Sequence, residues 1–279
     1  MAAHRLRRTS GACVAGPVRL VFLALPLALL VAGCGGSPKQ GSVAGTEPST
    51  AVSSAKPAKI VPAPDPGFGA ARLGQCYRMQ PPQSRASVAT GRRVSCRKRH
   101  TTVVAYVGFV RRAVTAKTPL AKRRKLGKRV CEPAYRGAAG GTLADRATSI
   151  LTWTLFTPDQ AQLQRGARWV RCDVLARSGQ SLVRLPAAQP FLGAGVPEQL
   201  RICQNEAGTD VSCGHPHAYR VEAVYRAAGE HYPDATAYTP LARARCKELT
   251  KKDGGFWQPP SVEGWAAGDR FIRCLSAPS

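Results

Sequence analysis

Two short motifs bring a cysteine and a histidine to the same spacing. The pattern V-S-C-x-x-x-H occurs with Cys96 and His100, and again with Cys213 and His217. A thiolate and an imidazole can hold a metal ion or act together as nucleophile and base, and a cysteine can instead form a structural disulfide. The choice among these three depends on the compartment of the protein and on its other cysteines.

The first 35 residues are typical of a secretory signal. Several arginines precede an apolar run from Leu20 to Val31, which Pro26 interrupts, and the run is shorter than the roughly 20 residues of a membrane-spanning helix. The V-A-G-C sequence that ends at Cys34 resembles the bacterial lipobox. We expect a lipoprotein signal peptide at 1–33, lipidation of Cys34, and a mature chain at the outer face of the cytoplasmic membrane. The alternative is an ordinary signal or a short anchor that contains a cysteine.

An oxidising location makes disulfides the favoured use of the cysteines. Of the ten cysteines, Cys13 lies in the signal and Cys34 in the lipobox, which leaves eight. The C-x3-H spacing does not match the C-x2-C ligand pairs of structural zinc sites, and thiol catalysis needs a free thiolate. We therefore expect His100 and His217 to orient a turn or cap a strand beside a disulfide. No catalytic residue, metal or cofactor is predicted.

The eight cysteines form two sets of four with other matched residues. T-P-L-A precedes the third cysteine of each set, and G-x-R-aromatic-β-branched-R-C ends each set, at 166–172 and 268–274. This predicts a flexible tether at 34–67, a first unit at 68–185, a linker at 186–199 and a second unit at 200–279. Identical pairing in both units leaves three connectivities, of which we favour Cys76–Cys96, Cys131–Cys172, Cys203–Cys213 and Cys246–Cys274.

Local patterns predict the same elements in each unit. Runs rich in β-forming residues follow the C-x3-H motifs, at 100–110 and 217–227. Thr118-Pro119 and Thr239-Pro240 predict an N-cap followed by proline at the first helical position, so that the third cysteine lies on a helix. The fourth cysteine ends a strand-like run. The expected fold class is α+β, with two tandem disulfide-stapled units, each a short antiparallel sheet with a packed helix.

Basic residues are concentrated in the first unit. Residues 68–185 hold 24 basic and 4 acidic side chains, whereas residues 200–279 hold 10 and 9. Thr118 and Cys131 are 13 positions apart but Thr239 and Cys246 only 7, which predicts six extra residues that lengthen or loop the first helix. Leu126 and Val130 can face inward. Each cation near an anionic membrane can contribute about 1 kcal/mol, so we predict an anionic-surface site at Lys122, Arg123, Arg124, Lys125, Lys128 and Arg129.

The partner of that site is expected to be an anionic membrane surface or a phosphate-bearing wall polymer. The alternative is a solvated charged face with no partner. The extracytoplasmic location argues against nucleic acid despite the net charge of +25.

The ordered motifs resemble the septum formation domain family of actinobacteria. The second unit carries Cys203, Cys213-x3-His217, Tyr232-Pro233, Cys246, Trp257-Gln-Pro-Pro, Trp265-x2-Gly268-Asp269-Arg270 and Cys274. The first unit lacks Tyr-Pro and has Gly166-Ala167-Arg168 where Gly-Asp-Arg is expected. The resemblance spans nearly all of 72–276 and implies a membrane-anchored protein linked to septation, with motif or structural roles for His100, His217, Trp257, Trp265, Gly268, Asp269 and Arg270.

No G-x-S-x-G, H-E-x-x-H, P-loop or dinucleotide-binding fingerprint occurs in the sequence. We expect a non-enzymatic lipoprotein that binds or scaffolds in the cell envelope or at the septum, with a division or envelope protein as a further partner. One alternative is an extracytoplasmic enzyme with Cys–His thiol-redox or wall-modifying chemistry. The other is a metal-binding module that uses His215 and His217.

Overall fold

The structure, a computed structural model, describes residues 63–252 and 255–277. The expected signal peptide at 1–33, Cys34 and the tether up to residue 62 lie outside the described residues. Residues 59–279 form one compact unit, which contains both sheets. Within the described ranges, no helix is long and apolar enough to cross a membrane.

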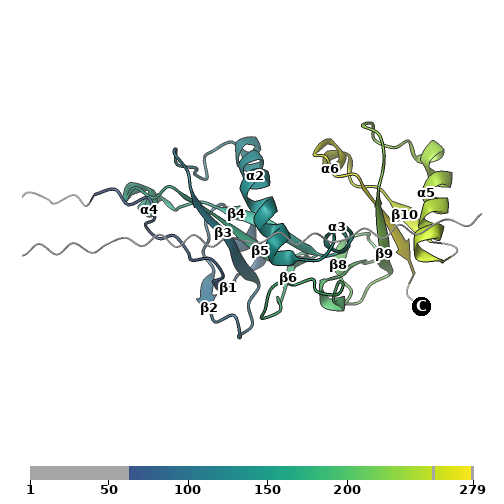
Figure 1. Cartoon of the computed structure of the whole chain (residues 1–279), viewed down its shortest axis with the longest axis horizontal. Coiled ribbons are helices and arrows are strands. Elements are labelled where there is room, and N and C mark those ends of the chain that lie inside the picture. The colour runs from purple at the N-terminus through teal and green to yellow at the C-terminus, as the bar shows by residue number, and fades with distance from the viewer. Residues whose placement is uncertain (1–62, 253–254, 278–279) are drawn as a thin grey trace, which may run out of the picture. The chain divides into compact units, whose positions relative to one another are not determined.

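The first sheet is antiparallel and has six strands in the order β2–β1–β3–β5–β4, with β6 also paired to β5. The strands are β1 (Cys76–Arg78), β2 (Arg92–Val94), β3 (Thr102–Phe109), β4 (Leu151–Phe156), β5 (Trp169–Ser178) and β6 (Ser181–Val183). The long helix α2 (Leu120–Ala139) packs against β3, β4 and β5 (Figure 1). Three short helices, α1 (Pro81–Arg85), α3 (Leu143–Ala147) and α4 (Gln160–Gln164), complete this part.

The second sheet is also antiparallel and has five strands in the order β8–β7–β9–β11–β10. The strands are β7 (Ile202–Gln204), β8 (Asp210–Ser212), β9 (Tyr219–Arg226), β10 (Phe256–Gln258) and β11 (Phe271–Ser276). Helix α5 (Ala235–Thr250) packs against β9, β10 and β11 (Figure 1), and η1 (Glu198–Leu200) and α6 (Val262–Ala266) are short. Matched in chain order, these five strands have the same neighbours as β1 to β5. The predicted α+β class, with a helix packed on each antiparallel sheet, is confirmed.

The predicted start of the second helix is wrong. Helix α5 begins at Ala235, and its N-cap is Asp234, whose carboxylate accepts a hydrogen bond from the Ala237 N–H at 2.9 Å. Thr239 and Pro240 lie inside the helix. A capping carboxylate satisfies a free N–H of the first turn, and this gain outweighs the local signal of Thr-Pro. The first helix begins at Leu120, one residue after the expected proline, and Pro119 is its N-cap.

The corrected helix start also changes the interpretation of the basic residues. Helix α2 begins 11 residues before Cys131, and α5 begins 11 residues before Cys246. The two T-P-L-A sequences are therefore not structurally equivalent, and the expected six-residue insert does not exist. Counted from the cysteine, Lys122–Lys125 occupy the positions of Ala237–Pro240, so the first unit gains its charge by substitution.

The two sheets share one hydrophobic core. A single cluster of buried residues includes Val103 and Val174 of the first sheet and Val221 and Leu275 of the second. The expected linker at 186–199 also belongs to this core, to which it contributes Phe191, Leu192 and Val196. The Leu192 N–H donates to the Ala139 carbonyl at 2.7 Å, which joins the segment to the end of α2.

The chain also contacts the first sheet before the expected boundary at residue 68. The Asp65 N–H donates to the Arg165 carbonyl at 2.9 Å, and the Pro66 carbonyl accepts a hydrogen bond from the Arg168 N–H at 2.9 Å. The last residues of the predicted tether, 63–67, are therefore attached to the unit that they precede.

Candidate functional site

All eight cysteines of the described residues form disulfides, in the favoured pairing. Cys76–Cys96 and Cys203–Cys213 each join the first strand of a sheet to the turn that follows its second strand. Cys131–Cys172 joins α2 to β5, and Cys246–Cys274 joins α5 to β11. The fourth cysteine of each set lies inside its strand rather than at its end, because the strand continues past the site at which the helix is attached.

The two histidines of the C-x3-H motifs have the same geometry. Nδ1 of His100 lies 2.9 Å from the carbonyl of Lys98, and Nδ1 of His217 lies 2.8 Å from the carbonyl of His215. A carbonyl only accepts, so Nδ1 donates in both. Each imidazole thus holds the turn next to a disulfide. His100 is fully buried, and its Nε2 has no hydrogen-bond partner among the residues that the structure describes.

The W-x2-G-D-R motif forms a closed turn between α6 and β11. The guanidinium of Arg270 lies 4.2 Å from the ring centre of Trp265 and donates to the Trp265 and Asp269 carbonyls. The Asp269 carboxylate accepts from the Phe271 N–H at 3.0 Å, and Gly268 has a φ of 93°, which favours glycine. These polar groups bond within the turn, as the expected structural role of the motif requires.

Trp257 joins β10 to helix α5. Its ring centre lies 5.5 Å from that of Tyr238 in a tilted arrangement, a contact typical of packed aromatic pairs. In the first unit Gly166 has a φ of 89°, as Gly268 does, but Ala167 replaces the aspartate and is buried. The turn therefore persists without its carboxylate.

The predicted basic residues lie on the first three turns of α2, which is unbroken through Gly127. Leu126 and Val130 are half-buried, which confirms their inward orientation. The Arg123 side chain is held in place by hydrogen bonds, because it donates to the Ser87 hydroxyl and to the Thr118 carbonyl. Lys128 donates to the Ala267 carbonyl at 2.6 Å.

The other four basic side chains, Lys122, Arg124, Lys125 and Arg129, are exposed. None of them has an ion pair within the part of the chain that the structure describes. Lys122, Lys125 and Arg129 are spaced by three and four residues, so they share one side of the helix. Arg124, two positions from Lys122, lies on another side of the helix. We refer to these three residues and Arg124 together as the basic face of α2.

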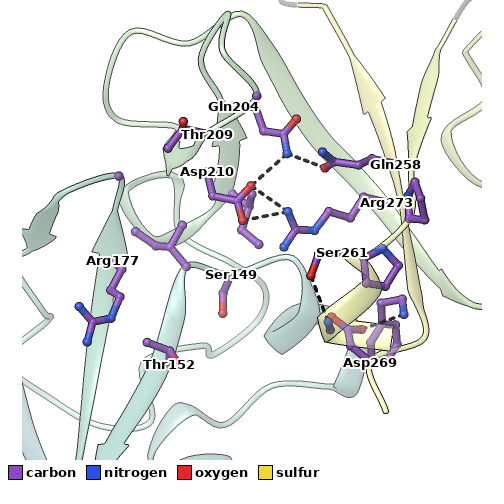
Figure 2. A pocket seen from close by; sticks show the side chains of 18 of the residues that line it. Ser149, Thr152, Arg177, Gln204, Thr209, Asp210, Gln258, Ser261, Asp269 and Arg273 are labelled. Atoms are coloured by element: carbon purple, nitrogen blue, oxygen red, sulfur yellow. Dashed lines mark hydrogen bonds and ion pairs between the residues drawn. The ribbon is translucent and has the colours of Figure 1, made fainter. Parts of the chain in front are cut away.

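A polar network that the sequence did not reveal lies on the face of the second sheet opposite α5. Asp210 of β8 binds Arg273 of β11, with both carboxylate oxygens 2.8 Å from Nη1. Nε2 of Gln204 donates to Asp210 at 3.0 Å and to Gln258 at 2.6 Å. Figure 2 shows these four side chains together at one side of a pocket of about 650 Å³.

The first sheet has a related but more deeply buried arginine. Nε and Nη2 of Arg171 donate to the Asp173 carboxylate at 2.6 and 2.5 Å, and Thr102 donates to the same carboxylate at 3.0 Å. The guanidinium also lies 3.9 Å from the ring centre of Tyr77. Arg171 and Arg273 both stand in the repeated R-C motif, which could have identified them. Their acidic partners come from different strands, so the repeat did not predict Asp173 or Asp210.

Within the described residues, no three His, Cys, Asp or Glu side chains are grouped as a metal site would need. This includes His215, whose Nδ1 lies 3.0 Å from the Ser178 hydroxyl.

Comparison with known proteins gives one match. The family model described as septum formation matches residues 73–274, which is most of the chain. No curated protein and no solved structure matches this sequence. The matched range runs from just before the first structural disulfide to Cys274 and so includes both sheets. The chain therefore belongs to the septum formation family, which supports a role in cell division or the cell envelope.

Proposed function

We propose that this protein is a lipid-anchored, extracytoplasmic envelope protein that binds an anionic surface through the basic face of α2 and acts as a scaffold without catalysing a reaction. The observation that carries the proposal is the exposure of Lys122, Arg124, Lys125 and Arg129 without ion pairs among the described residues. Family membership supports the envelope or division setting. The lipobox-like sequence at Cys34 supports the anchor.

The electrostatics of α2 favour a surface over a single small ligand. The four cations of the basic face are presented on a rigid helix that a disulfide fixes to β5, and no acidic residue precedes Glu132 on this helix. Glu132 is occupied by Arg136. Lys122, Lys125 and Arg129 therefore point into solvent from one side of the helix, which suits a plane of phosphate groups.

The second unit supports this interpretation by contrast. The positions equivalent to the basic face hold Ala237, Thr239, Pro240 and Ala244, which are uncharged. The fold of the sheet and helix therefore does not require the cations. A charge that the scaffold does not need is available for binding.

Two positive observations support a non-catalytic role. The cysteines of both C-x3-H motifs are oxidised in disulfides, and the polar groups of the W-x2-G-D-R turn bond to one another and to the backbone. The motif residues are thus occupied in the internal structure of the unit to which each belongs.

The experiment uses residues 59–279 and vesicles with or without phosphatidylglycerol, with a phosphate-rich wall polymer as a separate arm. The test variant carries Lys122→Gln, Arg124→Gln, Lys125→Gln and Arg129→Gln. At about 1 kcal/mol per cation before screening, we expect it to lose at least about tenfold in affinity. Wild-type binding should also weaken as salt is added, because exposed charges are screened beyond about 10 Å at 0.1 M.

The matched control neutralises four exposed cations elsewhere in the first unit, Arg92, Arg97, Lys98 and Arg99. It has the same net charge as the test variant and should keep most of the affinity. Equal losses of affinity in both variants would show that binding depends on the overall charge of the protein rather than on the basic face of α2. Salt-independent binding would overturn the proposal, and the arm that binds tighter identifies membrane or polymer as the surface.

A further inference from the structure

The first sheet has a hollow of about 580 Å³ on the face opposite α2. Arg171 lines it, next in sequence to Cys172, whose side chain is bonded to α2. Successive residues of a strand point to opposite faces, so Arg171 points away from the helix. Tyr77, Arg93 and Trp169 also line the hollow. Its volume lies within the range of about 300–1,000 Å³ that is typical of small-molecule sites.

This hollow is the positional equivalent of the pocket on the second sheet. Tyr77 follows the first cysteine of its set, as Gln204 does, and Arg93 is the register partner of Tyr77, as Asp210 is of Gln204. Trp169 and Arg171 correspond in the same way to Phe271 and Arg273, through the repeated R-C motif. Two matching positions of the fold therefore form two hollows with different linings.

The charges of the two hollows differ sharply. In the second sheet Asp210 neutralises Arg273. In the first, Arg171 takes its partner from its own strand, Asp173, and the position of Asp210 is occupied by Arg93. Among the described residues, the lining contains Arg72, Arg93 and Arg171 and no acidic side chain.

Two of these arginines are available to a ligand. Arg72 and Arg93 are exposed, and neither side chain has an ion pair or hydrogen bond within the described residues. Gln75 accepts from the Tyr77 hydroxyl at 3.0 Å through Oε1, which leaves its amide NH2 group to donate. Small apolar side chains, Val88 and Ala89, form another part of the wall.

From this geometry we propose that the hollow binds a small molecule or polymer unit that carries an oxyanion, either phosphate or carboxylate, with Arg93 and Arg72 as the anion-binding residues. Guanidinium groups match the oxygens of both anions with paired hydrogen bonds. The Gln75 amide and the small apolar wall suit a short polar backbone, such as a polyol or sugar, attached to the anion. The site is separate from the basic face of α2 and does not depend on it.

The test is an NMR titration of residues 59–279 with inorganic phosphate, glycerol phosphate and glucuronate, with glycerol and glucose as neutral controls. We expect saturable shifts of the backbone amides at 70–77 and 88–93 and of the Trp169 indole. Arg93→Gln should weaken binding by about tenfold, the loss of one charge-assisted contact. Arg93→Asp, which copies the second unit, should abolish it.

The control is Arg92→Gln, which removes the same charge from the neighbouring residue of the same edge strand. Arg92 is exposed and does not line the hollow. The affinity of the Arg92→Gln variant for the anions should therefore stay within about twofold of that of the wild type. Equal losses in the two Gln variants, equal binding of the neutral compounds, or no saturable binding of any anion would overturn the proposal. Binding of phosphate compounds alone identifies the ligand as a phosphate, and binding of glucuronate alone identifies it as a carboxylate. The quadruple variant of α2 should leave these affinities unchanged.

Discussion

Gly127 of α2 lies directly against the indole ring of Trp153 on β4. A Cβ atom at position 127 would be 2.6 Å from Cη2 and from Cζ3 of the ring, far closer than carbon atoms pack in protein interiors. Glycine inside a helix costs about 1 kcal/mol relative to alanine. The close contact explains why this buried helical position has no side chain, whereas the equivalent residue of α5 is Ala242.

We predict that Gly127→Ala lowers the free energy of unfolding by about 1 kcal/mol, because an overpacking cost of about 1–3 kcal/mol exceeds the gain in helix propensity. Gly137 of the same helix is the matched control. Apart from the adjacent residues and backbone of its own helix, no atom of the described residues lies within 4 Å of a Cβ placed there, so Gly137→Ala should raise stability by about 0.5–1 kcal/mol. Chemical denaturation of both variants gives the comparison, and a stabilised Gly127→Ala variant would contradict the packing argument.

The disulfides should contribute unequally. Cys131–Cys172 closes 41 residues and Cys203–Cys213 only 10. In the loop-entropy account, removal of the first pair by serine substitution should cost about 4 kcal/mol and removal of the second about 3 kcal/mol. Thermal unfolding measures the order. Thiol titration of the denatured wild-type 59–279 unit should find no free thiol, and free thiols at Cys96 or Cys213 would revive the Cys–His alternative.

The buried pair of Arg171 and Asp173 gives a third prediction. Asp173 is fully buried, and Arg171 is 4% exposed. Asp173→Asn leaves the guanidinium charge buried without its counter-ion and should cost about 3–5 kcal/mol. Asp210→Asn removes the equivalent partner of Arg273 at the half-exposed site of the second sheet and should cost about 1 kcal/mol or less.

Chemical denaturation of the two Asn variants measures this difference. The double variant Arg171→Met with Asp173→Leu removes both charges and should recover most of the lost stability. If it stays as unstable as Asp173→Asn, then packing around Arg171, rather than its charge, determines the cost.

The cysteine spacing predicted much of this fold, and the reason is physical. The same order of four cysteines and their flanking motifs in two sets constrains the pairing, and runs of β-forming residues locate β3 and β9. The helix start predicted from Thr239-Pro240 is wrong because Asp234, earlier in the chain, is the stronger N-cap. Local helix propensity cannot decide between two competing helix starts. The choice also depends on where the fold places Cys246, and the local sequence does not contain this information.

The candidate site was only partly predictable for a similar reason. A run of basic residues can be recognised from the sequence alone. The hydrogen bonds from Arg123 to Ser87 and from Lys128 to the Ala267 carbonyl could not be predicted, because they depend on segments distant in the chain. The sequence alone did not mark Arg93 as a binding residue. Its role depends on its pairing with Tyr77 across two strands, and on the fact that the equivalent position of the second sheet holds Asp210 instead of an arginine.

The proposed lipidation of Cys34 gives a fourth prediction. Cys34→Ala should move the protein from the membrane fraction to the soluble extracytoplasmic fraction. Two or more acyl chains give a stable anchor, whereas a protein without acyl chains can bind the membrane only weakly through its surface. Fractionation at low and at high salt separates the anchor from the basic face. Unchanged membrane retention of the variant at high salt would contradict lipidation as the main attachment.

The last prediction concerns pH. The Arg220 guanidinium donates to both oxygens of Glu198, at 2.8 and 2.5 Å, and thereby lowers the pKa of this carboxyl below its ordinary value of 4.5. Since the folded-state pKa is below the unfolded one, the stabilisation is complete above 4.5 and is lost as the pH falls through the folded-state pKa. Glu198 is 56% exposed, so screening keeps the effect below about 1 kcal/mol. Thermal unfolding of wild type and Glu198→Gln across this acidic range should show a shallower acid loss of stability in the variant, with the two curves approaching at the lowest pH. Parallel curves over the whole range would show that Arg220 does not stabilise the charged carboxylate.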